Sequence, residues 1–208
     1  MELQRNWYAV KVFFNKVFAL EGKLQARGLE TFLAVNKLQL KGEEYLRAQR
    51  RMALDTNPLE VLYVREGPVI YRRVPLVNSL LFVKATEEEI CEVEALLKEP
   101  LSYGGSLMGF IYKNAERKEF AIIPPAQMDI FRMVVESAPG GAKVFTPDDI
   151  GRFGLGEKVR VKEGPLKGAE GYIKRIRRDR KLLVCIEGVI AVASSYIPPQ
   201  FLEKTDSQ

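Results

Sequence analysis

The residues best suited to chemistry in this sequence form a short basic run. Between positions 174 and 181, six of the eight side chains are Lys or Arg. Such a density attracts nucleic-acid phosphates without reading the bases, and no aromatic residue interrupts the run to stack on a base. We therefore predict a nucleic-acid-binding site, or alternatively a solvated turn that keeps its domain soluble, at Lys174, Arg175, Arg177, Arg178, Arg180 and Lys181.

The rest of the sequence offers little to an enzyme. It contains no histidine, the commonest general base and metal ligand. It also has no CxxC pair, nucleophile elbow or phosphate-binding loop. We expect a protein that is not an enzyme and that holds neither a metal ion nor another cofactor.

The cysteines and the hydropathy bear on the compartment. Cys91 and Cys185 lie far apart, each inside an apolar pattern, which favours two buried free thiols over a disulfide. No segment approaches the roughly 20 apolar residues of a membrane span, and the first residues lack the pattern of a signal peptide. These features predict a cytoplasmic protein without a membrane partner.

The net charge of +5 is unevenly distributed along the chain. Residues 1–150 hold 20 basic and 20 acidic side chains, whereas residues 151–208 hold 12 basic and 7 acidic ones. The second part therefore carries the whole excess. This asymmetry indicates two domains and a polyanionic partner for the second.

Strands and helices alternate in the first two thirds of the chain. "NWYAVKVFF" alternates as a strand, and Val17, Leu20 and Leu24 follow at helical spacing, with Asn15 as an expected cap. The next segments predict a strand at "LETFLAV", a short exposed helix at "GEEYLRAQRRMALD" and a hairpin turning at Glu66-Gly67-Pro68. A strand at 75–84 and a helix opened by a Thr86–Glu89 capping box follow. The last predicted elements of this part are a strand at 107–112 and a helix from Pro125. This order predicts an α+β fold with helices packed on a mostly antiparallel sheet.

The last third has a different pattern. Residues 138–153 are rich in Gly and Pro without a period, which is typical of a linker. From residue 155 onward, short strands alternate with turns that contain Gly164, Gly168 and Gly171. About fifty residues of short strands without a helix predict a small closed barrel, because closure removes exposed sheet edges.

Several of these segments together resemble the NusG family of transcription elongation factors. "NWYAVKVFFNKVFALEGKLQARGLETFL" resembles the opening of the family's N-terminal (NGN) domain, and "VPLVNSLLFVK" and "LMGFIY" resemble two of its later strands. "GEKVRVKEGPLKGAEGYIKRIRRDRK" looks like a KOW motif in an SH3-like β-barrel. The resemblance implies an NGN domain at residues 1–137, a linker at 138–153 and a KOW domain at 154–204.

The resemblance also implies a function. The family's N-terminal domain binds a coiled coil on the clamp of bacterial RNA polymerase and suppresses pausing and termination. Such docking needs an exposed apolar patch with a polar rim. The residues expected to form it here are Tyr8, Phe13, Phe14, Val77 and Leu80, with Lys16 on the rim. Tyr8 and Leu80 could equally be ordinary core residues, since strand residues alternate between faces.

The C-terminal tail resembles one branch of the family more than the housekeeping protein. That branch is the UpxY-type antiterminators, which act on capsular polysaccharide operons. The barrel loop that in the family contacts a ribosomal protein and the terminator Rho reads Glu187-Gly188-Val189 here, in place of Phe-Gly-Arg. We therefore expect a specialised monomeric antiterminator whose KOW domain has an unidentified partner, and whose recruitment depends on leader DNA or nascent RNA.

Two other functions compete with this interpretation. One is a housekeeping NusG-like factor, against which the altered barrel loop argues. The other is a ribosome- or RNA-binding protein that carries a KOW barrel. Against the latter, residues 1–150 are neutral, whereas an RNA-binding protein is expected to be basic throughout.

Overall fold

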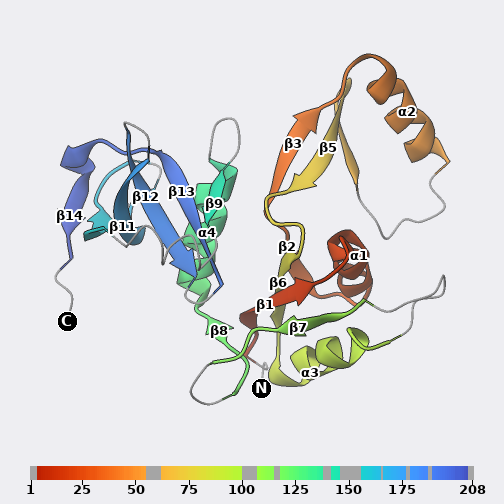
Figure 1. Cartoon of the computed structure of the whole chain (residues 1–208), viewed down its shortest axis with the longest axis horizontal. Coiled ribbons are helices and arrows are strands. Elements are labelled where there is room, and N and C mark those ends of the chain that lie inside the picture. Colours follow the sequence, from red (N-terminus) through yellow and green to blue (C-terminus); the bar gives the residue numbers. More distant parts are fainter. Residues whose placement is uncertain are drawn as a thin grey trace. The chain divides into compact units, whose positions relative to one another are not determined.

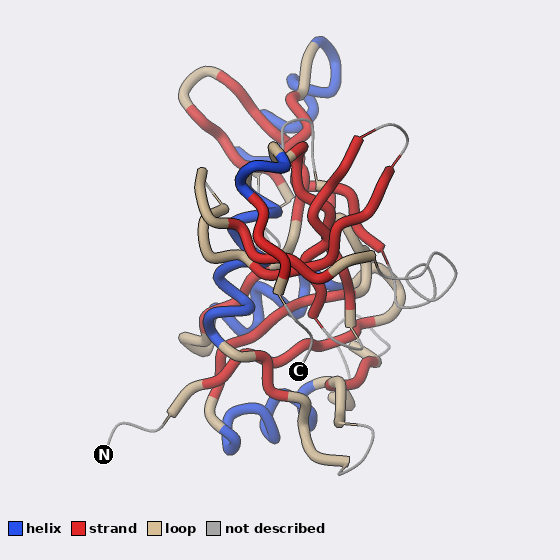
Figure 2. Tube along the Cα trace, turned by 90° about the vertical axis from the view of Figure 1, so that its left-hand side faces the viewer, coloured by secondary structure: helices blue, strands red, loops and turns tan. Residues whose placement is uncertain are grey.

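The computed structural model describes most of the 208-residue chain. The described residues are 4–54, 62–99, 107–114, 118–137, 142–145, 156–164, 166–176, 179–186 and 189–205. Contacts between residues divide the chain into two compact units, Met1–Ile123 and Pro124–Gln208. Figure 2 shows the trace with its strands in red and its helices in blue.

An antiparallel sheet forms the centre of the first unit (Figure 1). Its strand order is β2-β6-β1-β7, and β8 also pairs with β1. The strands are β1 (Asn6–Val12), β2 (Glu30–Phe32), β6 (Leu80–Ala85), β7 (Gly109–Ile111) and β8 (Ile122–Ile123). The predicted strand is confirmed in β1, but not the division between its two faces: Tyr8, Val10 and Val12 enter this core, and Trp7 and Ala9 on the other face are buried as well.

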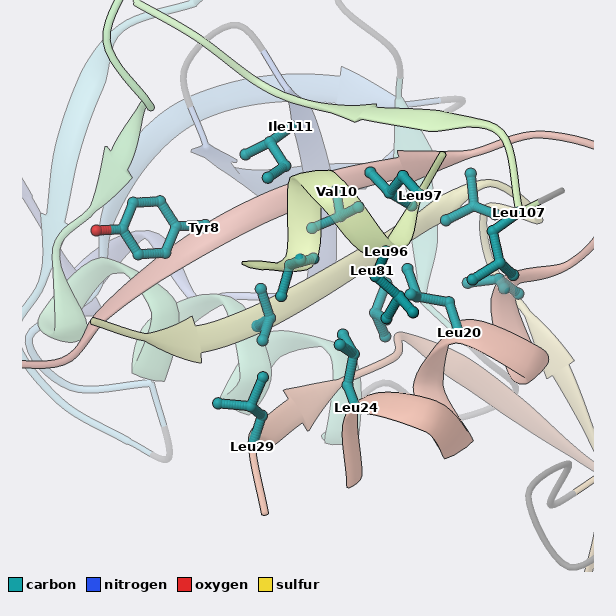
Figure 3. Packing of buried hydrophobic residues seen from close by; sticks show 14 of the residues in the cluster. Tyr8, Val10, Leu20, Leu24, Leu29, Leu81, Leu96, Leu97, Leu107 and Ile111 are labelled. Carbon is teal, nitrogen blue, oxygen red and sulfur yellow. The ribbon is translucent and has the colours of Figure 1, made fainter. Parts of the chain in front are cut away.

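Helices α1 (Val17–Ala26) and α3 (Glu87–Leu96) supply the rest of this core. Figure 3 shows Leu20 and Leu24 of α1 gathered with Leu81 of β6 and Leu96 of α3. Leu20, Leu24 and Leu81 are all fully buried. Burial of each leucine side chain contributes about 1.5–3 kcal/mol, so this packing fixes both helices on one face of the sheet.

The helix starts were only partly predictable. The Thr86–Glu89 capping box of α3 is confirmed: the Glu89 N–H donates to Thr86 Oγ1, and the Thr86 N–H donates to a carboxylate oxygen of Glu89. The expected Asn15 cap of α1 is wrong, because Lys16 occupies the cap and Asn15 has a left-handed backbone with φ 55°. Cys91 is exposed rather than buried, since the core face of α3 follows Ile90, Val93 and Leu96.

A small lobe extends from the first unit between β2 and β6 (Figure 1). It consists of the three-stranded sheet β3-β5-β4 and helix α2. Its elements are β3 (Val35–Gln39), α2 (Gly42–Ala53), β4 (Tyr63–Glu66) and β5 (Val69–Pro75). The predicted exposed helix and the hairpin after Glu66 are both confirmed. The lobe has its own core of Leu40, Ala48 and Ile70.

Arg73 of β5 joins this lobe to α1. Its guanidinium donates two hydrogen bonds of 2.8 Å to the two carboxylate oxygens of Glu21. The same guanidinium lies 5.1 Å from the centre of the Phe18 ring. Glu21 is buried with 4% of its surface exposed. A charge buried this deeply requires its partner, so the contact holds the lobe in one position on α1.

In the described residues, the second unit has an antiparallel sheet of six strands and the α-helix α4. The strand order is β14-β10-β11-β12-β13-β9. The strands are β9 (Lys143–Phe145), β10 (Lys158–Val161), β11 (Glu170–Ile176), β12 (Asp179–Ile186), β13 (Ile190–Tyr196) and β14 (Leu202–Lys204), with a 3₁₀ turn, η1 (Pro199–Phe201), before β14. The predicted run of short strands after residue 155 is confirmed.

Helix α4 (Pro125–Glu136) belongs to this second unit and not to the N-terminal domain, where it was predicted. It packs on β12 and β13, and the Gln127 side chain donates a 2.7 Å hydrogen bond to the Cys185 carbonyl. The buried stripe is as predicted, with Met128, Phe131 and Val135 all inside. An amphipathic stripe fixes which face is buried but not which sheet covers it.

Part of the expected linker is also a strand. Within residues 138–153, Lys143–Phe145 forms β9 and pairs with β13 at the edge of the sheet. Residues 138–141 and 146–153 lie outside the described part of the chain. The boundary between the two units therefore falls at Ile123, before α4, and not at residue 137.

The predicted turn glycines have two separate roles. Gly164 and Gly168 have left-handed backbones, with φ 86° and 88°. Gly171 is needed for a different reason, because a Cβ atom there would lie 2.2 Å from the Leu183 carbonyl oxygen on β12. The β11 and β12 backbones can pair at this distance only without a side chain.

We expect Gly171→Ala to lower the free energy of unfolding by about 2 kcal/mol, because β11 and β12 must separate locally. Urea unfolding of the full chain measures this change. Gly168→Ala is the control, since a Cβ there meets no atom within 4 Å and only backbone conformation opposes it. Because Gly168→Ala carries the cost of a left-handed backbone, it calibrates that separate effect; an unchanged stability of Gly171→Ala would show that the close approach of β11 and β12 does not require glycine.

The architecture confirms the α+β class, with helices packed on an antiparallel sheet followed by a second, strand-rich antiparallel unit. No helix among the described residues is both long and apolar enough to span a bilayer.

Candidate functional site

Three segments meet at one end of the first sheet. The Val12 N–H donates a 2.8 Å hydrogen bond to the Ser79 carbonyl in the turn before β6. The next residue, Phe13, donates a 2.9 Å bond to the Met108 carbonyl before β7. Strand β7 then continues along β1, with Phe110 opposite Lys11. Residues almost a hundred positions apart in sequence are thus brought together.

Aromatic side chains cluster at this end. The centres of the Phe13 and Phe14 rings are 6.4 Å apart, and those of Phe13 and Phe110 are 6.1 Å apart. Tyr112 adjoins Phe110 at 5.3 Å. We call Phe13, Phe14, Phe110 and Tyr112 the aromatic cluster. These separations lie in the range of favourable ring–ring contacts.

The aromatic cluster is strongly exposed for residues of its type. Phe14 exposes 70% of its surface, Phe110 43% and Phe13 38%, and the neighbouring Met108 exposes 50%. Phe110 lies on the sheet face opposite α1 and α3, because Ile111, the next residue, enters the core between sheet and helices. Neighbouring exposed aromatic and Met side chains are typical of a surface that binds another protein.

The backbone that presents these side chains is unusual. Phe14, Asn15 and Met108 have φ values of 58°, 55° and 37°. This left-handed region is sterically costly for residues with a Cβ atom, most of all for bulky ones. Two of the three are exposed apolar residues, so burial in the core does not account for the conformation. Such outliers concentrate at functional sites.

Lysine side chains border the aromatic cluster, and Tyr112 contributes a phenolic hydroxyl to it. Lys11 Nζ lies 5.9 Å from the centre of the Phe110 ring, within the range of a cation–π contact. Burial raises the pKa of the Tyr112 hydroxyl, so the phenol stays neutral at physiological pH. Lys16, which the sequence predicts on the rim, is half-buried, and its N–H donates to the Phe13 carbonyl at 3.4 Å.

The other residues predicted for docking lie differently. Tyr8 exposes 2% of its surface and packs in the core against Phe120, with ring centres 6.4 Å apart. Burial raises the pKa of its hydroxyl. Leu80 is buried with 6% exposed, and Val77 is half-buried in the turn before β6. Only Phe13 and Phe14 of the predicted set are exposed apolar side chains.

Met108, Phe110 and Tyr112 did not figure among the predicted docking residues. They adjoin Phe13 only because β7 pairs with β1, and a long-range register of this kind is not visible in a single sequence. The available signal was local: Phe110 and Tyr112 alternate with Ile111 in the strand "GFIY", which places them together on one face.

The basic run lies on the hairpin between β11 and β12. Lys174 pairs with Lys181 across the strands, and Arg175 pairs with Arg180 in the adjacent position. Neighbouring positions of a strand alternate between the two faces of a sheet, so this register does not put the two pairs on one face. Arg177 and Arg178 lie outside the described residues.

The predicted barrel loop is described only at its last residue. Val189 is buried, with 5% of its surface exposed, and its N–H donates to the Ile186 carbonyl. Glu187 and Gly188 lie outside the described residues. In the described part of the chain, no group of three or more Cys, Asp or Glu side chains could hold a metal ion.

The chain was compared with family models, curated proteins and solved structures. No protein-family model matches the chain, and no curated protein matches it in sequence. Among solved structures, the chain is similar to one described as "Domain interaction in Thermotoga maritima NusG", with 16% sequence identity and a TM-score of 0.39 over 98% of each chain. At this degree of similarity, any function must be argued from the residues of the chain itself.

Proposed function

We propose that this protein is a transcription elongation factor that binds bacterial RNA polymerase through the aromatic cluster. The exposed rings of Phe13, Phe14 and Phe110 at the end of the first sheet carry the proposal. The resemblance of the sequence to the NusG family supports it, since that family uses its N-terminal domain to bind the clamp coiled coil.

The chemistry of the cluster suits a protein partner better than a small ligand. Aromatic residues and Met are enriched at the centres of protein interfaces, whereas Lys is found at the rim. Here the four rings form the centre, and Lys11 and Lys16 lie beside them. The apolar seam of a coiled coil is buried between its helices and is flanked by charged side chains, so its outer face would offer charges to the lysines and needs an exposed apolar side chain to pack on the rings.

The second unit adds a contact with nucleic acid in this proposal. Six of the eight residues from Lys174 to Lys181, which span the β11–β12 hairpin, are Lys or Arg, and a run of this charge would attract phosphate. Leader DNA and nascent RNA are the polyanions nearest to an elongating polymerase. The partner of the loop around Val189 is not identified by its residues.

The finer role that we propose is antitermination at capsular polysaccharide operons, by a monomer recruited to its own leader. The similarity of the C-terminal tail to the UpxY-type antiterminators supports this role. The substitution of the family's Phe-Gly-Arg by Glu187-Gly188-Val189 also supports it, because an acidic and a valine side chain replace the ring and the guanidinium of the housekeeping loop.

Single-round transcription with bacterial polymerase tests the proposal. The template carries a terminator behind either a generic leader or the leader of the protein's own operon. We expect increased readthrough on its own leader only. Readthrough on both leaders would indicate a general elongation factor, and no effect on either, together with no binding to polymerase, would contradict the proposal.

A further inference from the structure

Helix α2 of the lobe has a charge pattern that polymerase docking does not explain. Residues 35–75 hold 8 basic and 5 acidic side chains, whereas the rest of residues 1–123 hold 10 basic and 11 acidic ones. The excess positive charge of the first unit is therefore concentrated in the lobe. Three of these basic residues are arginines near the end of α2, Arg47, Arg50 and Arg51.

The arginines lie on one flank of the helix. Tyr45, Ala48 and Met52 turn toward the small core of the lobe. At 3.6 residues per turn, the arginines fall within about 100° of arc, on the side of the helix that is turned away from that core face. All three are exposed. They therefore form one basic surface, which we call the arginine flank.

Most of this charge is not neutralised locally. Arg47 donates a 3.0 Å hydrogen bond to Glu43, but both side chains are more than three-quarters exposed, and such a pair is weak. No carboxylate among the described residues pairs with Arg50 or Arg51. Both lie in the last turn, where a cation also stabilises the helix end, so an experiment must separate this structural role from binding.

The geometry points to the phosphate backbone of double-stranded DNA as the ligand: we propose that the arginine flank binds a DNA duplex without reading its sequence. Guanidinium groups bind phosphate in a bidentate manner. The flank has no exposed aromatic ring on which a single strand could stack, because the Tyr45 hydroxyl donates to the Pro68 carbonyl within the lobe.

A lipid surface is a poorer match. The exposed apolar side chains of this helix segment are Leu46 and Leu54, whereas a helix lying in a bilayer surface needs a continuous apolar face. The apolar face of α2 is already occupied by the lobe core. The lobe is also held by the Arg73–Glu21 contact, so the arginine flank is presented from a fixed support.

Fluorescence anisotropy with a short labelled DNA duplex and the full chain, without polymerase, tests the proposal over a series of salt concentrations. We expect the triple variant R47Q/R50Q/R51Q to bind at least about 10-fold more weakly at low salt. The slope of log K against log salt should fall by about 2.7, because three phosphate contacts are lost. The basic run on the β11–β12 hairpin should account for the binding that remains.

Three further variants sharpen the test. K23Q/R27Q/K98Q removes the same charge from other accessible positions of the first unit, and its slope should stay close to that of the unchanged protein. R47K/R50K/R51K keeps the charge and should restore most of the binding. R50Q alone should lower the slope by about 0.9, which keeps the test valid if the triple variant folds poorly.

Equal slopes for the arginine variant and its charge-matched control would overturn the proposal. A loss confined to single-stranded DNA would overturn the assignment to a duplex. A loss of polymerase binding with unchanged DNA binding would instead assign the arginine flank to an acidic protein surface, which also overturns it. The assay omits polymerase, so a negative result for DNA binding does not contradict the proposed elongation function. A negative result in the transcription assay likewise does not contradict DNA binding by the arginine flank.

Discussion

Replacing Phe13 and Phe14 together with serine should weaken binding to RNA polymerase by about 100-fold or more. Central aromatic residues of an interface commonly contribute 2 kcal/mol or more each, which is about 30-fold in affinity. The loss should be less than fully additive, because the two rings contact each other. Stability should change little, since Phe14 is 70% exposed and Phe13 is 38% exposed.

The affinity is best measured by biolayer interferometry with purified polymerase, alongside thermal unfolding of each variant. A matched control replaces Leu38 and Ile122 with serine, because these are apolar residues of similar exposure outside the aromatic cluster. The control should bind normally. If both double variants bind equally well, the aromatic cluster is not the docking surface; if Phe110→Ser also weakens binding, the cluster acts as a whole.

Replacing Glu21 with alanine should lower the free energy of unfolding by about 3–5 kcal/mol, because the buried guanidinium of Arg73 is left without its counter-charge. The side chains of Arg73 and Glu21 are only 14% and 5% exposed. Arg73→Met should have a similar effect. The double variant Glu21→Leu/Arg73→Met should recover most of the loss, because an apolar pair leaves no buried charge.

Urea unfolding of the unchanged protein, Glu21→Leu, Arg73→Met and the double variant completes a double-mutant cycle, and Glu21→Ala is measured beside it. Arg47→Ala is the control for an exposed pair, since its partner Glu43 is 84% exposed, and it should change stability by about 0.5 kcal/mol or less. A loss below 1 kcal/mol for Glu21→Ala would show that the Arg73–Glu21 contact does not anchor the lobe.

Local signals in the sequence predicted much of this fold. The Thr86–Glu89 capping box, the hairpin after Glu66 and the apolar stripe of α4 depend on residues a few positions apart. Each element can therefore be inferred from its own segment. The strands on which a helix packs cannot be inferred in this way. Nothing within α4 indicates that it packs on β12 and β13 rather than on the sheet of the first unit.

The candidate site shows the same limit. The exposure of Phe13 and Phe14 was expected on the assumption that adjacent strand residues point to opposite faces, but β1 ends at Val12 and both rings are exposed in the turn that follows. Tyr8 could not be assigned to core or surface until α1 and α3 were seen to cover its face. Phe110 joins the cluster through the register of β7 on β1, which depends on contacts about a hundred residues apart.

The left-handed backbone at Phe14 and Asn15 bears on how fast a complex would form. Each left-handed residue with a side chain costs about 1–2 kcal/mol relative to ordinary backbone, and the folded unit sustains this cost before any partner arrives. The hydrogen bond from the Phe13 N–H to Met108 holds the segment in place. Docking should then need no rearrangement of this loop. Association should follow a single exponential whose rate rises linearly with polymerase concentration, with no plateau from a slow conformational step.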